Sequence, residues 1–202
     1  MNTCFFLPYL PAVSWMVAYA QTADAVIEAC ENFQKSTPRN RTRIATASGP
    51  LLLSIPLAEG RDKHRPYTAV RISYSENWQV KHWRSITSAY QSAAYFAHYA
   101  PQIEPFYKEK YEFLFEYNLA LLQKLLQLLH LNIPPVLTNN YLKGAYTCDY
   151  RSGEPAISLP RYPQVFEERI GFQPGVSVID LLFNQGPDAA RYLLRTASVC
   201  TI

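Results

Sequence analysis

The pattern of apolar residues at the start of the chain predicts a strand, a helix and a second strand. Residues 4–7 form a short apolar run of strand length, and residues 25–28 form another. Between them, Pro11 suits the first turn of a helix that continues to about residue 21. This order predicts the opening of a βαβ unit, in which a helix joins two parallel strands.

Further strands are expected before residue 75. Residues 41–47 and 51–57 form two candidate strands on either side of a break at residues 48–50, and Pro50 and Pro56 indicate that the second lies near a sheet edge. Positions in residues 68–73 alternate with the period of a strand. Together with the opening unit, these segments predict a central mixed sheet.

The second part of the chain has a helical pattern. It runs from residue 78 to about residue 131, with breaks at Pro101 and Pro105. Residues 113–131 carry one narrow polar stripe in an otherwise apolar stretch, which predicts a buried helix rather than a membrane span. Ser177 and Asp180 have the spacing of a capping box, so a helix is expected from there to about Gly186, with a last short helix from about residue 188.

These elements predict an α/β fold in a single domain over residues 1–202, with helices flanking the sheet. The α/β portion covers about residues 1–75, and the mainly helical portion covers about residues 76–202. The chain contains no repeat and no low-complexity linker. With 49% apolar residues among 202, it has enough apolar surface for one sizeable core.

The charges are few overall but concentrated in one part of the sequence. Nineteen Lys and Arg against 16 Asp and Glu give a net charge of +3, which argues against a general nucleic-acid binder. Residues 35–84 hold ten Lys or Arg against three Asp or Glu, a net of +7. The seven glycines form no phosphate-binding motif, so an anion site must use side chains or helix ends. The basic region is either a surface for an anionic ligand or a set of solvated loop charges.

The cysteines predict reduced thiols and no metal site. Cys4, Cys30, Cys148 and Cys200 show no C-x-x-C spacing and no metal-ligand spacing with the histidines. Reduced thiols are typical of the cytoplasm, which is the predicted location. Residues 4–20 end like a signal-peptidase site, but prolines interrupt this stretch and no Lys or Arg precedes it, so we expect neither a cleaved signal nor a membrane span.

The segment after the second predicted strand, residues 31–43, carries candidates for ligand binding. In open α/β sheets, the loops after the carboxyl ends of the strands form the ligand crevice. Guanidinium groups hold phosphate or carboxylate through paired hydrogen bonds, as a replacement for a glycine-rich loop. The predicted binding residues are Lys35, Arg39, Asn40 and Arg41, and Glu31 is a predicted catalytic carboxylate. The alternative is an edge strand protected by its charges.

Two further groups of residues are candidates. His82, on the helix that begins at Trp78, is the predicted general base or acid at neutral pH, with a hydrogen-bonded structural histidine as the alternative. Asp180 and Asn184 are four residues apart on one face of a predicted helix, where they either point into a cleft or cap the helix. A third segment, residues 162–166, contributes Gln164 as a predicted binding residue.

Several short motifs occur in a characteristic order along the chain. They are Pro8-Tyr9-Leu10-Pro11, Arg39-Asn40-Arg41, the strand from Gly49 to Ile55-Pro56, Tyr90 with Tyr95-Phe96, Tyr162 with Gln164, and the stretch from Ser177 to Gly186. In this order the chain resembles the WbqC-like protein family, from about residue 5 to residue 193. The middle of the chain, between residues 131 and 162, is shorter than in that family.

The resemblance implies a role in the synthesis of bacterial surface polysaccharide of the O-antigen type, for which aminoacyl or glycyl transfer to a sugar has been suggested. We therefore expect a transferase that moves an acyl or aminoacyl group to a sugar or nucleotide sugar. Lys35, Arg39 and Arg41 would bind phosphate or carboxylate, and Glu31 or His82 would deprotonate the attacking amine or hydroxyl. Aromatic rings suit the flat faces of sugars, so Tyr9 and Trp78 would line the sugar pocket.

The expected partner is thus an anionic small molecule, namely a sugar, a nucleotide sugar or an acyl donor. The alternative is a non-catalytic binding or assembly protein of the same pathway, because the sequence shows no nucleophile–base pair. A nucleotidylyltransferase-like fold is a third hypothesis, and it lacks the paired histidines that we would require. The residues indicate no cofactor and no oligomeric state.

Overall fold

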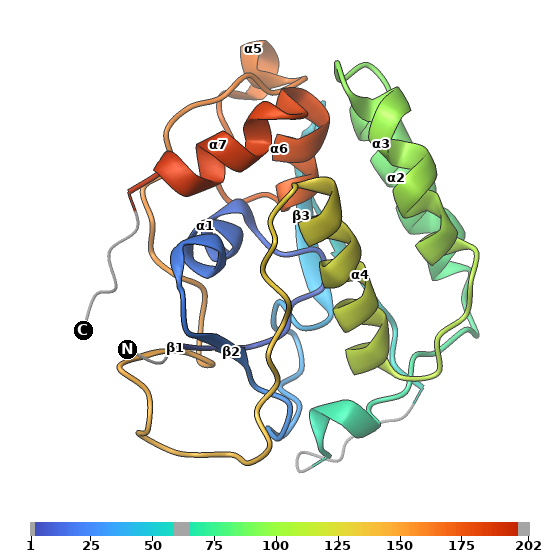
Figure 1. Ribbon diagram of the computed structural model, residues 1–202. Helices are drawn as coiled ribbons and strands as arrows, with labels where there is room; N and C mark the ends of the chain where they lie inside the picture. The colour runs from blue at the N-terminus through green and yellow to red at the C-terminus, as the bar shows by residue number, and fades with distance from the viewer. Residues whose placement is uncertain (1–2, 59–64, 198–202) are drawn as a thin grey trace.

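A three-stranded parallel sheet lies at one end of the molecule (Figure 1). In the computed structural model, which describes residues 3–58 and 65–197, its order is β2 (Ala25–Ile27), β1 (Thr3–Phe5) and β5 (Cys148–Tyr150). Helix α1 (Val13–Gln21) joins β1 to β2, which pair in parallel. The predicted βαβ opening is therefore confirmed.

A separate antiparallel hairpin follows, formed by β3 (Arg41–Thr46) and β4 (Gly49–Ser54). Arg41 pairs with Ser54 and Thr46 pairs with Gly49, and Gly49 has a φ of 107° in the turn, where a side chain would be strained. The α/β class is confirmed, although within the described residues the parallel strands and the hairpin form two sheets.

The strand expected over residues 68–73 is wrong. The chain there forms a short 3-10 helix, η1 (Tyr67–Ala69), followed by single bridges from Arg71 to Phe113 and from Ile72 to Leu57. Val70 and Ile72 are buried and Arg71 is exposed, so the alternation exists. It does not make a strand, because neighbouring residues find their backbone partners in two different segments.

Helices make up most of the remaining structure. They are α2 (Trp78–Tyr90), α3 (Phe96–Ile103), η2 (Glu104–Tyr107), α4 (Leu114–Leu128), α5 (Glu167–Ile170), α6 (Val178–Gln185) and α7 (Asp188–Arg195). Helices α6 and α7 pack on α1, and α4 contacts α3 and η1. None of the helices in residues 3–58 and 65–197 has the length and apolar character that crossing a membrane requires.

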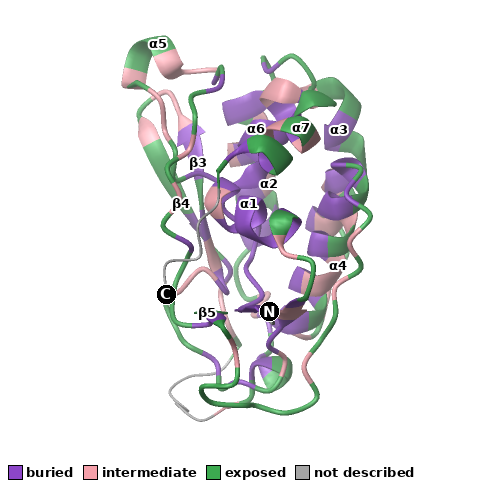
Figure 2. Cartoon of the chain, turned by 60° about the vertical axis from the view of Figure 1, so that its left-hand side comes forward, coloured by how far each residue is buried: buried purple, intermediate pink, exposed green. Residues whose placement is uncertain are grey.

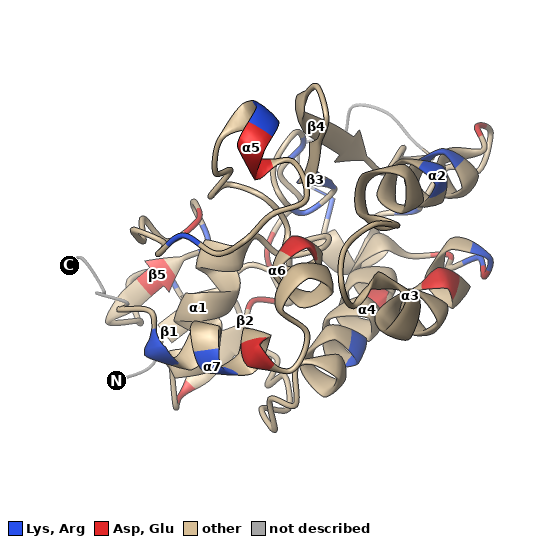
Figure 3. Cartoon of the chain, turned by 90° about the horizontal axis from the view of Figure 1, so that it is seen from above, with Lys and Arg blue, Asp and Glu red and all other residues tan. Residues whose placement is uncertain are grey.

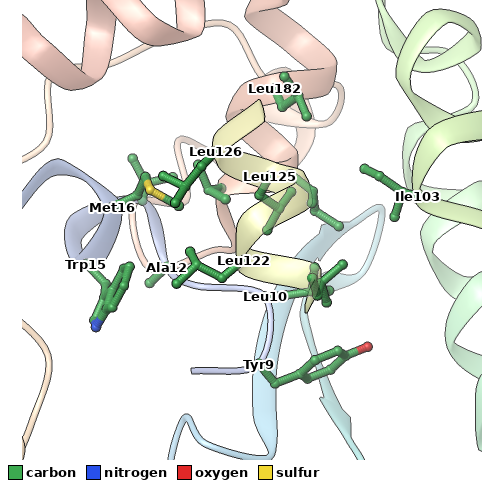
Figure 4. Close-up of a cluster of buried hydrophobic side chains, with 14 of the residues drawn as sticks. Tyr9, Leu10, Ala12, Trp15, Met16, Ile103, Leu122, Leu125, Leu126 and Leu182 are labelled. Carbon is green, nitrogen blue, oxygen red and sulfur yellow. The ribbon is translucent and has the colours of Figure 1, made fainter. Parts of the chain in front are cut away.

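The core lies around α4, which Figure 4 shows between α1 and α3. Leu122 and Leu125 are fully buried, as are Met16 of α1 and Leu182 of α6. Figure 2 shows that α1 is covered almost completely, whereas the hairpin side of the molecule is more exposed. The helix predicted to be buried thus lies at the centre of this core. That residues 1–202 form one domain stays a prediction.

The ends of α6 follow the local signals in the sequence. The Ser177 side chain accepts a hydrogen bond from the backbone N–H of Ile179 and caps the helix. Gly186 ends the helix at a φ of 53°, and a Cβ there would lie 2.5 Å from the ring of Tyr95. This position therefore needs glycine both for its backbone angle and for the close approach of the ring.

The prediction of reduced thiols holds for two of the cysteines. Cys4 and Cys30 are free, with Cys4 buried and Cys30 exposed. Cys148 is disulfide-bonded, so the prediction is wrong for this residue. Cys200 lies outside the described residues. The cytoplasmic location stays a prediction.

Candidate functional site

Two cavities open beside the carboxyl ends of the parallel strands, where α/β sheets commonly bind ligands. The loop after β1, the strand β3 and the three residues 36–38 before it form most of the first cavity. The loops after β2 and β5 form most of the second. The segment from residue 30 to residue 43 contributes to both cavities, and its role as a ligand crevice stays a prediction.

The first cavity, which we name the arginine cavity, has a volume of about 160 Å³. Its polar lining comes from Ser36, Thr37, Arg41, Thr42, Arg43, Glu154 and Ser177. Arg41 and Arg43 are two residues apart on β3, so both project from the same face of the hairpin. In Figure 3, which colours Lys and Arg blue, blue segments lie along β3.

Arg41 is the notable residue of the arginine cavity. Its Nε is buried and has no hydrogen-bond partner among the residues that the structure describes. Buried polar atoms are nearly always paired, because an unpaired donor loses its interaction with water without compensation. An unpaired guanidinium N–H beside a cavity is therefore a donor for a bound anion.

The wall of the arginine cavity is held by the loop after β1. Leu10 has a φ of 43°, which is unusual for a residue with a side chain, and its carbonyl accepts a hydrogen bond of 2.8 Å from the Thr42 hydroxyl. The backbone N–H of Tyr9 donates to the carbonyl of Pro38 at 2.9 Å. These contacts fix the loop to β3 and to the segment just before it.

Glu154 contributes a carboxylate to the same cavity. Glu154 is exposed to solvent, yet partial desolvation by the surrounding protein raises its pKa, and the charge of Arg43 opposes that rise. Two guanidinium groups against one carboxylate leave the charged lining of this cavity with a net charge of +1. The cavity therefore favours an anion.

The second cavity, which we name the tyrosine cavity, has a volume of about 520 Å³. It is lined by Cys30, Glu31, Asn32, Phe33, Gln34, Tyr141, Asp149, Arg151 and Ser152. The carbon at the centre of the Arg151 guanidinium lies 4.5 Å from the centre of the Tyr141 ring and 5.1 Å from that of Tyr146. The Tyr141 ring, which lines this cavity, thus packs against the guanidinium of Arg151.

Buried ion pairs form the floor beneath these loops. Arg39 donates from Nε and Nη2 to the two carboxylate oxygens of Glu31, at 2.7 and 2.6 Å, and from Nη2 to the carbonyl of Arg151 at 2.8 Å. Arg151 donates to Glu28 at 2.9 Å and to both oxygens of Asp149. Burial raises the pKa of Glu31, and the hydrogen bonds from Arg39 oppose that rise.

Glu31 and Arg39, both predicted to act on a ligand, therefore bond to each other instead. Arg39 is 2% exposed and Glu31 is 3% exposed. Asn40, which is also buried, donates from its side chain to the carbonyl of Ile55 at 3.2 Å and lies outside both cavities. Lys35 is exposed in the loop between the two cavities. Of the predicted binding residues in this segment, the structure brings Arg41 to an open cavity.

His82 lies in a buried aromatic cluster. Its Nδ1 is 3.0 Å from the hydroxyl of Tyr9, and that hydroxyl is 2.9 Å from the hydroxyl of Tyr107. The ring of Trp78 packs edge-on against the imidazole of His82. The carbonyl of Ser54 also bonds the imidazole. Burial lowers the pKa of His82 to about 4, so the ring is neutral at pH 7. Tyr9 lines the arginine cavity, whereas Trp78 and His82 do not.

Gln164, Asp180 and Asn184 form another closed cluster. The Tyr162 hydroxyl and Nε2 of Gln164 both donate to Oδ1 of Asp180 at 2.9 Å, and Nδ2 of Asn184 donates to the backbone carbonyl of Asp180. Asp180 is fully buried, which raises its pKa to about 6. The side chains join α6 to the preceding loop and lie outside the two cavities.

Several residues of the cavities were not among those singled out for the site. Arg43 has a sequence signal, because it shares the two-residue spacing of Arg39 and Arg41. Tyr141, Arg151 and Glu154 have none, because they lie in an irregular stretch whose fold positions them beside distant segments. Within the described residues, no group of three or more His, Cys, Asp or Glu is arranged to hold a metal ion.

Comparison with known proteins gives a family but no biochemical activity. The model of the WbqC-like protein family matches residues 8–149 and 155–192, which leaves Arg151 and Glu154 between the two matched stretches. The chain is 26% identical over 221 residues to "Uncharacterized protein Rv1507c" of Mycobacterium tuberculosis, covering 92% of this chain and 94% of that protein. No solved structure matches the chain. Since the family model covers most of its length, the chain belongs to the WbqC-like protein family.

Proposed function

We propose that this protein is a transferase of bacterial surface polysaccharide synthesis, and that it binds the anionic group of its donor substrate in the arginine cavity. The observation that carries the proposal is the buried Nε of Arg41, a residue that lines this cavity, since this atom has no hydrogen-bond partner within residues 3–58 and 65–197. A phosphate or carboxylate oxygen would complete its hydrogen bonding. Membership of the WbqC-like protein family supports the pathway, through the association with surface polysaccharide that the resemblance implies.

The size and lining of the cavity suit the charged end of a substrate. At about 160 Å³ it is smaller than the roughly 300–1,000 Å³ that sites for whole drug-sized ligands occupy. Ser36 lines the cavity with the two arginines, and its hydroxyl is a further donor, whereas the Thr37 hydroxyl already donates to the carbonyl of Gln34 at 2.7 Å. Ala12 and Ser177, the N-cap residues of helices α1 and α6, both line this cavity, so the positive ends of the two helix dipoles add to the attraction for an anion.

Glu154 is the candidate base for the transfer step. The acceptor's hydroxyl or amine would attack the carbonyl carbon of an activated acyl donor, with its proton passing to the Glu154 carboxylate. The bond to the phosphate-bearing leaving group would break, and that group would depart with the bonding electrons beside Arg41 and Arg43. The raised pKa of Glu154 makes it a better proton acceptor than an ordinary carboxylate.

The second candidate function is a non-catalytic binding protein of the same pathway. The closed environments of Glu31 and His82 favour it. Glu31 is hydrogen-bonded to Arg39, and His82 is 6% exposed and bonded to Tyr9 and Ser54. In this case the arginine cavity would hold an anionic glycan precursor without transferring a group.

Ligand binding and turnover separate the two candidates. Calorimetry with nucleotide sugars, nucleotides and acyl donors should detect a phosphate-bearing ligand, and Arg41→Met should weaken it while Arg191→Met, at an exposed arginine of α7, should not. Binding followed by transfer of the acyl group to a sugar supports the transferase. Binding without transfer, in the presence of every donor and acceptor pair tested, favours the binding protein. If Arg41→Met bound the ligand as tightly as the unaltered chain, both candidate functions of the arginine cavity would be refuted.

A further inference from the structure

The tyrosine cavity has a lining of a different chemical kind. Its charged lining residues are Glu31, Asp149 and Arg151, and the ion-pair cluster behind it adds Arg39 and Glu28. Three carboxylates against two guanidinium groups leave one net negative charge. An anion would meet repulsion here, whereas a neutral or cationic ligand would not.

Arg151 is not available to a ligand as a phosphate binder. Its Nη1 donates to Glu28, and its Nε and Nη2 donate to the two carboxylate oxygens of Asp149. The rings of Tyr141 and Tyr146 lie close to its guanidinium plane. Only 6% of the side chain is exposed. Arg151 therefore acts as a support that fixes Tyr141 and Asp149, rather than as a ligand contact.

The groups left open in the tyrosine cavity are an aromatic ring, amides and a carboxylate. Tyr141 is 52% exposed, although its ring rests near Arg151. The side chains of Asn32 and Gln34 are exposed and supply both donors and acceptors. The side chain of Asp149 is 38% exposed, and hydrogen bonds from Arg151 lower its pKa, so it stays an ionised acceptor.

From this lining we infer that the tyrosine cavity binds a non-anionic sugar ring, packed on Tyr141 with its hydroxyls bonded by Asp149, Asn32 and Gln34. A sugar ring has an apolar face for an aromatic side chain and a rim of hydroxyls for planar polar groups. The cavity volume, about 520 Å³, falls within the range of small-molecule sites. The inference extends the proposed function, since such a site would hold the acceptor beside the donor.

Saturation-transfer NMR with single sugars tests this inference on the full chain. The probes are glucose, glucosamine, glucuronate and uridine, each at concentrations up to about 50 mM, because millimolar dissociation constants correspond to the few kcal/mol expected from one ring. The spectra are recorded on Arg41→Met, so that binding of a carboxylate in the arginine cavity is weakened, and there we expect transfer to glucose and glucosamine and much weaker transfer to glucuronate. No transfer to either non-anionic sugar, or stronger transfer to glucuronate or to the base of uridine, would overturn the inference.

Variants at Tyr141 locate the binding. Tyr141→Ala should weaken sugar binding about fivefold or more, from the loss of an aromatic contact, and Tyr141→Phe should retain it. Leu142→Ala, at an exposed neighbour outside the cavity lining, is the matched control and should bind normally. Unchanged binding by Tyr141→Ala would place the sugar elsewhere and refute the inference.

The test of the sugar site in the tyrosine cavity can fail or succeed independently of the test of the proposed function. Titration with inorganic phosphate reports on the arginine cavity without any sugar present. Sugar binding that depends on Tyr141, together with no phosphate binding that depends on Arg41, would remove the proposed function alone. The reverse result would remove the sugar site alone.

Discussion

The arginine cavity and the tyrosine cavity share the segment from residue 30 to residue 43, yet their charged linings have opposite sign. In the arginine cavity, Arg41 and Arg43 outnumber Glu154, and Nε of Arg41 lacks a partner within the described structure. In the tyrosine cavity, Arg151 donates three hydrogen bonds to Glu28 and Asp149, and only 6% of its side chain is exposed. The comparison shows that an arginine indicates an anion site only where its own protein leaves its donors free.

The ion pair between Glu31 and Arg39 underlies this difference. Arg39 belongs to the same Arg-x-Arg pattern as Arg41, but its side chain turns inward to Glu31 and the carbonyl of Arg151. It thereby holds the loops after β2 and β5 together. The following predictions test the contrast between these residues.

The largest effect is expected from Arg39→Met. This change leaves the carboxylate of Glu31 buried without its cation, which should lower the free energy of unfolding by about 3–5 kcal/mol. Urea denaturation would measure the loss, with Lys35→Met as an exposed control expected to change little. Adding Glu31→Gln to Arg39→Met should recover part of the stability. A loss below about 1 kcal/mol for Arg39→Met would contradict the structural role.

Acid should reveal His82 as a buried structural residue. Its pKa is about 4 in the folded chain and ordinarily 6.5, so the unfolded chain takes up a proton first as the pH falls. Stability should therefore be lost between about pH 6.5 and pH 4, by about 3 kcal/mol in total, and this loss should be absent in His82→Gln. Unfolding curves of both chains across this range provide the measurement. If NMR titration gave His82 a pKa near the ordinary 6.5, His82 would again be a candidate for the general base.

A smaller but more specific effect is expected from Arg41→Met. Losing charge-assisted hydrogen bonds worth about 1.5–3 kcal/mol should weaken phosphate binding roughly tenfold or more. The phosphate affinity of Arg41→Lys should lie between those of the unaltered chain and Arg41→Met, because lysine keeps the charge but loses the planar set of donors. Calorimetric titration with phosphate measures the change. Equal affinities for Arg41→Lys and Arg41→Met would show that charge contributes nothing at this position.

The smallest effect on binding is expected from Glu154→Gln. Removing the single carboxylate from the arginine cavity should strengthen anion binding, by up to about fivefold for a partly solvated charge. If Glu154 is the base, the same variant should slow transfer at pH 7 despite tighter binding. Parallel binding and turnover assays separate the two effects. Faster transfer by Glu154→Gln would exclude the catalytic assignment.

The sequence by itself determined the local elements and placed the basic segment beside the parallel strands. The apolar runs before and after α1, the cap at Ser177 and the stop at Gly186 depend on neighbours a few residues away, so their patterns predicted them correctly. The same holds for the position of the residue 31–43 segment after a parallel strand. It does not hold for the 68–73 region, where the alternation was real but the pairing partners were distant.

Only the tertiary structure decided which polar residues are free to bind. Arg39 and Arg41 are alike in sequence, but Glu31 and the carbonyl of Arg151 lie within hydrogen-bond distance of Arg39, while Nε of Arg41 finds no described partner. His82 and Asp180 likewise acquire shifted pKa values from burial that a pattern does not show. The reason is physical: the state of a charged group depends on solvent exposure and on contacts between segments far apart in the chain.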